Sequence, residues 1–391
     1  MNRKNIIFSQ LMHLLIQKNF KPIINRYDGD RYVKRMSCIQ QLTTLFYVQI
    51  KDLFSLRDIQ TNLRAQADKW HHVGLETVAK STLADANRDR PYQIWGEMFY
   101  ALYEHCQKLA PANKFKIKMP VFTLDSTTIS LCLSQFSWAR YRKRKGAIKL
   151  HTLLDHNGCL PCYMSLTDGK CHDVKFAKNP ENGLPDLPPD SILTADRGYI
   201  DYSWLYSLHC KGTTFIIRAK VNMTYDDLGQ HKKANQKKGI LSDQVIELSN
   251  EYKYEDYPDT LRLIRIKDKK KDTYIDVLTN NFKLSAAKIA ELYKGRWEVE
   301  EFFKWIKQHL KIKTFIGTSE NAVYTQVWIA MICYLLLSFI KFQTKYSFSL
   351  LELKRVVKEL LWDSKSLFEV LRVNFDELMK FNKTPIQEAF Y

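Results

Sequence analysis

The chain has 391 residues, which is enough for two or three domains with a sizeable core. Apolar residues make up 45% and aromatic residues 13%, and this composition excludes an intrinsically disordered chain. Lys and Arg total 60 against 42 Asp and Glu, a formal net charge of +18. So large an excess favours a polyanionic partner, either a nucleic acid or an acidic membrane surface.

No targeting or membrane-spanning segment is expected. Residues 1–18 have apolar side chains at helical spacing but neither the apolar core nor the cleavage site of a signal peptide. The most apolar stretch, Val327–Ile340, is shorter than the roughly 20 residues that a membrane span needs, so we expect a buried helix there. The eight scattered cysteines indicate free thiols in a cytoplasmic protein, and the spacing around Cys159 and Cys162 is not that of a zinc finger.

Residues 1–115 are predicted to form a mostly helical N-terminal domain. Apolar residues recur at three- and four-residue spacing in Ile39–Leu53 and again in Trp95–Leu109. Between them, Ser81 or Thr82 can cap a short polar helix. Such a helix suits reading of the DNA major groove, and an ordinary surface helix fits equally well. The polar residues expected to project from it are Asn87, Arg88 and Arg90.

From residue 116 the pattern changes to short apolar strands. The expected strands are Val121–Leu124, Ala147–Leu154, Gly158–Leu166, Ser191–Ala195 and Thr213–Arg218, with a helix at Tyr202–Cys210. An Asn-Gly turn joins the second strand to the third, and the first and fourth end at Asp125 and Asp196. Three antiparallel strands followed by strand, helix and strand is the order of a ribonuclease-H-like α/β core.

The remaining chain divides into a β-rich insertion and C-terminal helices. Within residues 221–283, the expected strands are Val245–Leu248, Leu261–Ile266 and Thr273–Leu278. The basic turn Lys267–Lys271 suits either solvent or a phosphate. Ser285 can cap a long helix that runs to about residue 310, and Leu351–Leu361 is amphipathic. We therefore expect domains at 1–115, 116–345 and 346–391.

The long helix carries a polar row beside its apolar stripe. At about 100° per residue, Tyr293, Arg296, Glu300 and Lys307 share a sector of roughly 60°. This row is expected at the rim between core and water, with Glu298 and Glu301 facing solvent. An amphipathic helix with an Arg296–Glu300 ion pair is the simpler interpretation of the same pattern.

Two further carboxylates favour a catalytic site. Asp125 and Asp196 each follow an apolar strand, and an unpaired carboxylate there is costly unless a positive group neutralises it. Together with Glu300 they would repel one another, yet they would hold Mg²⁺ well because that ion prefers hard oxygen ligands.

The row Tyr293-x2-Arg296-x3-Glu300-x6-Lys307 matches the signature of the YREK-type DDE transposases, the insertion-sequence-four family. The blocks Thr123–Thr127, Thr194–Tyr199 and Trp138–Thr152 also resemble that family, in the same order. The resemblance covers residues 116 to about 345. The N-terminal segment resembles the helical DNA-binding domain of a Bacteroidetes-type subgroup.

This resemblance implies a transposase that binds its insertion-sequence ends, cleaves there and joins the 3′-OH to target DNA. Asp125, Asp196 and Glu300 would hold two Mg²⁺ ions, or Mn²⁺, one activating the attacking oxygen and the other stabilising the leaving oxygen. Its partners would be double-stranded DNA and a second copy in a synaptic homodimer. It would be nucleoid-associated when bound to DNA.

The resemblance also assigns DNA phosphate contacts to Tyr293, Arg296 and Lys307. The charge run Arg140–Lys149 suits phosphate neutralisation beside the cut, and its candidate contacts are Arg142, Lys143, Arg144, Lys145 and Lys149. His151 could lie near the metals or be a satisfied sheet histidine. Trp297 could stack on an unpaired base, although packing is the more frequent role. The alternatives are another ribonuclease-H-like nuclease and an inactive DNA-binding regulator.

Overall fold

The computed structural model of the chain describes residues 6–16, 20–76, 79–143, 145–231, 236–249, 256–268 and 273–372. The chain forms two compact units. Residues 111–305 form one, called here the sheet unit, and residues 1–110 with 306–391 form the other, called the helical unit.

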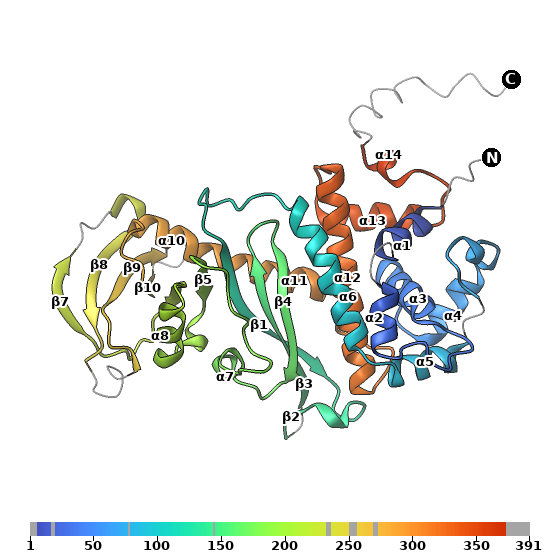
Figure 1. Cartoon of the computed structure of the whole chain (residues 1–391), viewed down its shortest axis with the longest axis horizontal. Coiled ribbons are helices and arrows are strands. Elements are labelled where there is room, and N and C mark those ends of the chain that lie inside the picture. The colour runs from blue at the N-terminus through green and yellow to red at the C-terminus, as the bar shows by residue number, and fades with distance from the viewer. Residues whose placement is uncertain are drawn as a thin grey trace, which may run out of the picture. The chain divides into compact units, whose positions relative to one another are not determined.

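The sheet unit is built on a ten-stranded sheet with the order β2-β3-β1-β5-β6-β10-β9-β8-β7, with β4 also paired to β3 (Figure 1). The strands are β1 Val121–Leu131, β2 Arg140–Arg142, β3 Lys145–Asp155, β4 Leu160–Asp168, β5 Ile192–Ala195, β6 Thr214–Arg218, β7 Asp226–His231, β8 Ile240–Glu247, β9 Leu261–Asp268 and β10 Thr273–Thr279. β3 is antiparallel to β1 and β4, whereas β5 is parallel to β1 and to β6. The order β4-β3-β1-β5-β6 is that of a ribonuclease-H-like core, which confirms the expected fold class.

The β-rich insertion continues this sheet instead of forming a separate one. β10 pairs with β6 in antiparallel register, and β9, β8 and β7 follow outward. The basic turn Lys267–Lys271 lies largely outside the described residues, so its two possible roles stay open.

The central strands present alternate residues to two cores. On one face, Leu193 and Phe215 pack with Leu205 and Leu208 of helix α8 (Tyr202–Cys210). On the other face, the neighbouring residues Ile192 and Ile216 pack with residues of helix α10 (Ala286–Gly295). Because successive strand residues point to opposite faces, a continuous apolar run is what a doubly covered sheet requires.

The expected long helix is interrupted once. α10 ends at Gly295 and α11 (Trp297–His309) begins two residues later, with Arg296 between them. Ser285 caps α10 as expected, since its side chain accepts from the Lys288 amide. A side chain at position 295 would collide with Phe115, because an ideal Cβ there lies 2.3 Å from that ring. Glycine therefore lets the backbone pass close to Phe115 just before the break.

The helical unit contains the elements from both ends of the chain. They are α1 Ile7–Ile16, α2 Phe20–Arg26, α3 Cys38–Lys51, α4 Leu56–Arg64, α5 Lys80–Asp89, α6 Gln93–Leu109, α12 Glu320–Thr344, α13 Leu350–Leu360 and α14 Leu367–Arg372. α13 packs on α12 and α3.

α12 is the central helix of this unit and packs against α6 and α3. It is long and apolar enough to cross a membrane, yet 94% of its most apolar window is buried within the described protein. A core helix is therefore its role here, as expected. The domain expected at 116–345 would place α12 with the sheet. In the structure α12 instead belongs to the helical unit, because its apolar side chains pack against the N-terminal helices α6 and α3.

Candidate active site

Asp125 and Asp196 lie side by side on neighbouring strands. Leu124 of β1 pairs with Ala195 of β5 in parallel register, and each aspartate is the next residue. Asp196 directly follows the last residue of β5 and caps the short turn after it, accepting a hydrogen bond of 2.7 Å from the Gly198 amide. Asp125 does not end its strand, contrary to expectation: β1 continues to Leu131 because β3 pairs with it along that whole length.

Arg296 joins the third carboxylate to the first. Its Nη1 donates to Asp125 Oδ2 at 3.1 Å and its Nη2 donates to Glu300 Oε1 at 2.6 Å. The Arg296 side chain is only 14% exposed. The i, i+4 ion pair expected on the helix is thus present, and the same guanidinium also ties α11 to β1.

The site carries more negative charge than Arg296 neutralises. Burial raises the pKa of Asp125 to about 7, and the nearby charges of Asp196 and Glu300 add to this, whereas Arg296 and the Ser126 amide lower it. A carboxyl group this reluctant to ionise marks a position where additional positive charge would be favourable.

These residues fit a hard divalent cation in chemistry, because all their donor atoms are carboxylate oxygens. As the side chains stand, no three His, Cys, Asp or Glu residues in the described part of the chain are grouped closely enough to hold a metal ion. Arg296 bonds to two of the three carboxylates. Holding a cation at Asp125 and Glu300 would therefore require Arg296 to release at least one of them.

A fourth carboxylate, which sequence reasoning did not single out, lies beside the pair of aspartates. Asp173 begins the short helix α7 (Asp173–Ala177) and accepts hydrogen bonds from Ser126 Oγ at 2.5 Å and from Lys149 Nζ at 3.2 Å. Its Oδ2 is 3.7 Å from the position of a Cβ built on Gly198. The only signal in the sequence is an acid at the first position of a short helix, which is too common to identify a site residue.

Tyr293 and Lys307, the other two residues of the signature, and the neighbouring Trp297 differ in how far they are buried. Tyr293 is 8% exposed and packs in the core under the sheet, deeper than the expected rim, and its ring centroid lies 5.9 Å from the guanidinium carbon of Arg296. Lys307 is half-buried on α11, and burial lowers its pKa. Trp297 is 57% exposed, so packing, the role favoured from sequence, is wrong for it.

Glu298 does not face solvent, which corrects a second expectation. Its side chain is 14% exposed and forms an ion pair with Lys114. Phe302, one turn further along α11, is also buried, so the apolar face is wider than the stripe inferred from sequence. Glu301 is exposed as expected.

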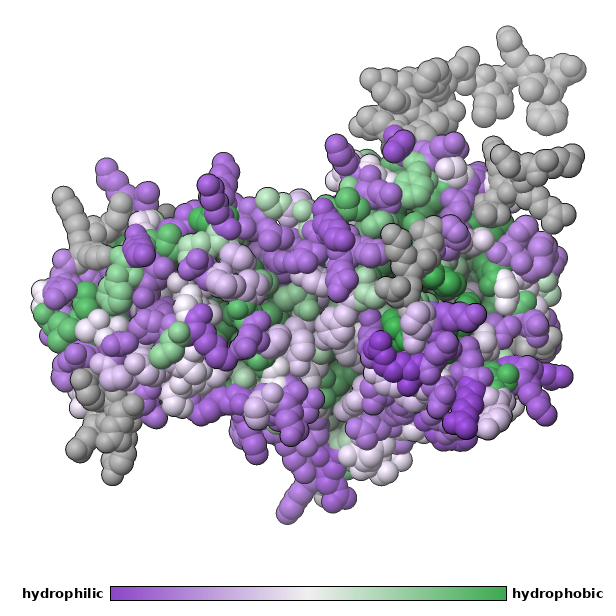
Figure 2. Space-filling view, viewed as in Figure 1, coloured by the Kyte–Doolittle hydropathy of each residue, from purple (hydrophilic) through white to green (hydrophobic). Residues whose placement is uncertain are grey.

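The basic run is split between solvent and the interior. Arg142, Lys143 and Lys145 are exposed around the β2–β3 turn, and Arg144 lies outside the described residues. Hydrophilic side chains cover the protruding tip that carries β2 (Figure 2). Lys149, by contrast, is 14% exposed and pairs with Asp173. A phosphate contact by Lys149 would therefore require that lysine to exchange its carboxylate partner for a phosphate.

His151 is a buried sheet histidine that matches one of its two expected roles only in part, because its Nδ1 has no hydrogen-bond partner and lies 3.8 Å from Asp173 Oδ1. It is fully buried, its ring stacks on Phe176 at 3.9 Å between centroids, and its Nε2 is 2.9 Å from Thr167 Oγ1. Burial lowers its pKa to about 4, so it is neutral at physiological pH.

In the helical unit, α5 keeps only part of its expected polar face. Asn87 is 2% exposed and accepts a hydrogen bond of 2.7 Å from Gln41, because it shares the buried face with Leu83 one turn earlier. Arg90 is also buried. The expectation that these two residues project is wrong, and Arg88 alone of the three is exposed, paired with Asp85 and Asp89.

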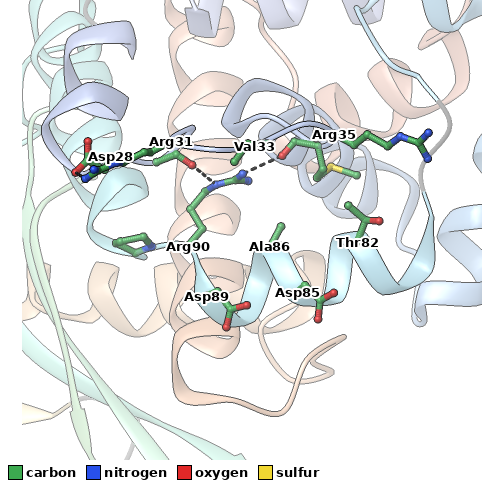
Figure 3. A pocket seen from close by; sticks show the side chains of 12 residues that line it. Asp28, Arg31, Val33, Arg35, Thr82, Asp85, Ala86, Asp89 and Arg90 are labelled. Atoms are coloured by element: carbon green, nitrogen blue, oxygen red, sulfur yellow. Dashed lines mark hydrogen bonds and ion pairs between the residues drawn. The ribbon is translucent and has the colours of Figure 1, made fainter.

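Figure 3 shows Arg90 reaching from the end of α5 toward the segment that contains Arg31 and Val33. Its guanidinium donates to the carbonyls of Gly29 and Met36, each at 2.9 Å. Asp85 and Asp89 point away from that segment on the helix (Figure 3). These residues line a hollow of about 330 Å³, and Arg90 in its lining is held by backbone carbonyls.

The fold and the paired aspartates define a nucleic-acid-processing enzyme with a ribonuclease-H-like core. Residues 116–336 match the transposase DDE domain family, and residues 3–76 match a domain family of unknown function. The chain belongs to the DDE transposase family, whose members are DNA-cleaving enzymes that use divalent metals.

Relatives named as transposases agree with this assignment. One from Sinorhizobium fredii is 30% identical over 74% of this chain and 79% of its own length. One named for insertion sequence element IS5377 of Geobacillus stearothermophilus is 28% identical over 88% and 87%. The insertion-sequence resemblance is thereby confirmed. The solved synaptic complex of piggyBac transposase with hairpin DNA aligns at a TM-score of 0.46 and 12% identity, over 94% of this chain and 82% of that one, which is too distant to carry an argument.

Proposed function

We propose that this transposase binds the terminal repeats of its own insertion sequence, cleaves DNA at their edges and joins the freed 3′-OH to target DNA. Asp125, Asp196 and Glu300 are the proposed catalytic triad and would hold two Mg²⁺ ions. The observation that carries this proposal is the register of β1 with β5, which sets the two aspartates side by side, together with the Arg296 link to Glu300.

Two bound cations would supply an activated attacking oxygen and charge stabilisation at the leaving oxygen. Arg296 would exchange a carboxylate for a DNA phosphate, since a guanidinium can bind either anion through two donors. Lys307 would add a phosphate contact. The exposed ring of Trp297 suits stacking on an unpaired base next to the cut.

The basic tip formed by Arg142, Lys143 and Lys145 would neutralise the phosphates of the flanking duplex. In the helical unit, which we propose as the DNA-binding domain, Arg88 is the residue of the α5 set that remains exposed for such a contact. Holding two transposon ends together implies a synaptic homodimer.

The direct test is a cleavage assay on a labelled duplex that carries the inverted repeat flanking the gene, with Mg²⁺, Mn²⁺ or EDTA. Wild-type protein should nick at the repeat edge only with metal, and Glu300→Gln should bind the duplex without nicking it. Glu301→Gln is the matched control, because that glutamate is exposed on the same helix. Cleavage that survives in Glu300→Gln would overturn its place in the triad. Binding without cleavage by wild type in every metal would favour an inactive regulator.

A further inference from the structure

Beneath the proposed triad, a row of buried polar side chains connects the three elements that carry it. Thr123 Oγ1 lies 2.6 Å from Thr194 Oγ1 and 2.7 Å from His156 Nε2. His156 Nδ1 lies 2.7 Å from Glu298 Oε2. Thr123 is on β1, Thr194 on β5 and Glu298 on α11, while His156 is in the turn between β3 and β4. We call these four residues the buried chain.

Three members of the buried chain stand two residues before a proposed metal ligand: Thr123 before Asp125, Thr194 before Asp196 and Glu298 before Glu300. Residues two apart on a strand point to the same face, so the two threonines lie directly behind the two aspartates. On the helix, residues two apart point in nearly opposite directions. Glu298 therefore holds α11 against the sheet from the side opposite Glu300.

The buried chain is built to be rigid. Thr123 and Thr194 have no exposed surface and His156 is 4% exposed. The His156 ring is also fixed by the edge of Phe115, at 5.1 Å between centroids, and its backbone amide donates to the Val121 carbonyl at 3.0 Å. Glu298 accepts from Cys159 Sγ at 3.1 Å as well and pairs with Lys114. Buried polar groups satisfied to this degree specify one geometry, because any displacement leaves a donor or acceptor unpaired.

We propose that the buried chain sets the spacing of the three carboxylates, and that Thr123, His156 and Glu298 are positioning residues for divalent-metal binding. The proposal rests on the proposed triad. Groups that hydrogen-bond directly to metal ligands typically contribute about 10- to 100-fold to metal affinity, and the buried chain, which acts on the ligands through their backbone, is expected to contribute at the lower end of that range.

Thr123 offers a pair of substitutions that separates positioning from packing. Thr123→Val keeps the shape of the side chain and removes its hydroxyl, whereas Thr123→Ser keeps the hydroxyl and removes a methyl group. If the hydroxyl positions the site, the valine variant should bind Mn²⁺ about 10-fold more weakly and the serine variant nearly as well as wild type. If only packing matters, the order should be reversed, because the serine variant alone leaves a cavity.

The measurement is the Mn²⁺ dissociation constant of the full chain without DNA, from the electron paramagnetic resonance signal of free Mn²⁺. Thermal unfolding in EDTA checks that each variant folds. Glu298→Gln should weaken Mn²⁺ binding like Thr123→Val, with Glu301→Gln as the control that leaves it unchanged. Equal affinity in wild type and Thr123→Val, or weaker binding in Thr123→Ser than in Thr123→Val, would overturn the proposal.

The variant Asp125→Asn distinguishes a failure of the positioning role from a failure of the proposed triad. Wild-type Mn²⁺ binding that Asp125→Asn does not reduce would refute the triad, and the positioning role with it. Binding that requires Asp125 but tolerates Thr123→Val would refute the positioning role alone.

Discussion

Arg296 in the sheet unit and Arg90 in the helical unit are both largely enclosed, and the two arginines have contrasting surroundings. In the sheet unit, Arg296 lies between two carboxylates, Asp125 and Glu300. In the helical unit, Arg90 donates mainly to backbone carbonyls, and its nearest carboxylate is 3.7 Å away on Asp30. Carbonyls of folded backbone cannot move away without local unfolding, whereas carboxylate side chains can rotate to another cation. Arg90 is therefore suited to holding a loop, and Arg296 to an exchange of partners.

The largest effect is expected where the carboxylates meet. Asp125→Asn, Asp196→Asn and Glu300→Gln should each reduce cleavage by on the order of 1,000-fold or more, as removal of an essential catalytic group does in other enzymes. Binding to the transposon end should be largely retained, because the basic surface is unchanged. Gel-shift and nicking assays on the same duplex check both. If any one variant cleaved DNA at the wild-type rate, the residue replaced in it would not belong to the triad.

Substitution of Arg90 should affect the stability of the protein, whereas substitution of the carboxylates should affect its activity. Arg90→Met removes three donor bonds and leaves the carbonyls of Gly29 and Met36 without these partners, so it should destabilise the protein by about 2–4 kcal/mol. Urea denaturation measures this. Arg88→Met on the exposed side of the same helix is the control, with a change within about 0.5 kcal/mol. Similar destabilisation in both variants would contradict the structural role of Arg90.

Without metal, Asp125 should make the stability of the protein depend on pH. Its pKa is raised to about 7 in the folded protein, mainly by burial, from an ordinary value of 3.8. Between these values the unfolded chain loses the proton while the folded protein retains it, so the free energy of unfolding falls as pH rises from about 4 to 7. Asp125→Asn should remove a penalty of roughly 1–4 kcal/mol above pH 7 and none below pH 4.

Thermal unfolding in EDTA across that pH range tests this. The variant should be the more stable protein at pH 8 although it is inactive. A variant less stable than wild type at pH 8 would mean that the ion pair of Asp125 with Arg296 outweighs the cost of burying the carboxylate.

The smallest effects are expected from substitutions of the exposed basic residues at the β2–β3 turn. Replacing Arg142, Lys143 and Lys145 by glutamine should lower the slope of log affinity against log salt by about 0.9 for each phosphate that the tip no longer neutralises. Cleavage of bound DNA should be unaffected. Binding measured over a range of KCl concentrations gives the slope, and an unchanged slope would show that the tip is merely solvated.

Much of the sheet unit could be predicted because its determinants are local in the sequence. Apolar runs such as Ser191–Ala195, followed by an acid, predicted a buried strand and a carboxylate at its end, and the strand order followed from hairpin and helix spacing. The spacing of Arg296 and Glu300 predicted their ion pair, since residues four apart on a helix are neighbours.

What the sequence could not decide was which polar residues are buried. Glu298, Asn87, Lys149 and Tyr293 each occupy a position where helical or strand periodicity allows a solvent-facing side chain, yet each is enclosed by a segment distant in the chain or by a wider apolar face. Burial of a polar group depends on whether a partner from elsewhere satisfies it, as His156 does for Glu298. Such partners are paired only by the tertiary structure, because nothing in the local pattern of either residue specifies the other.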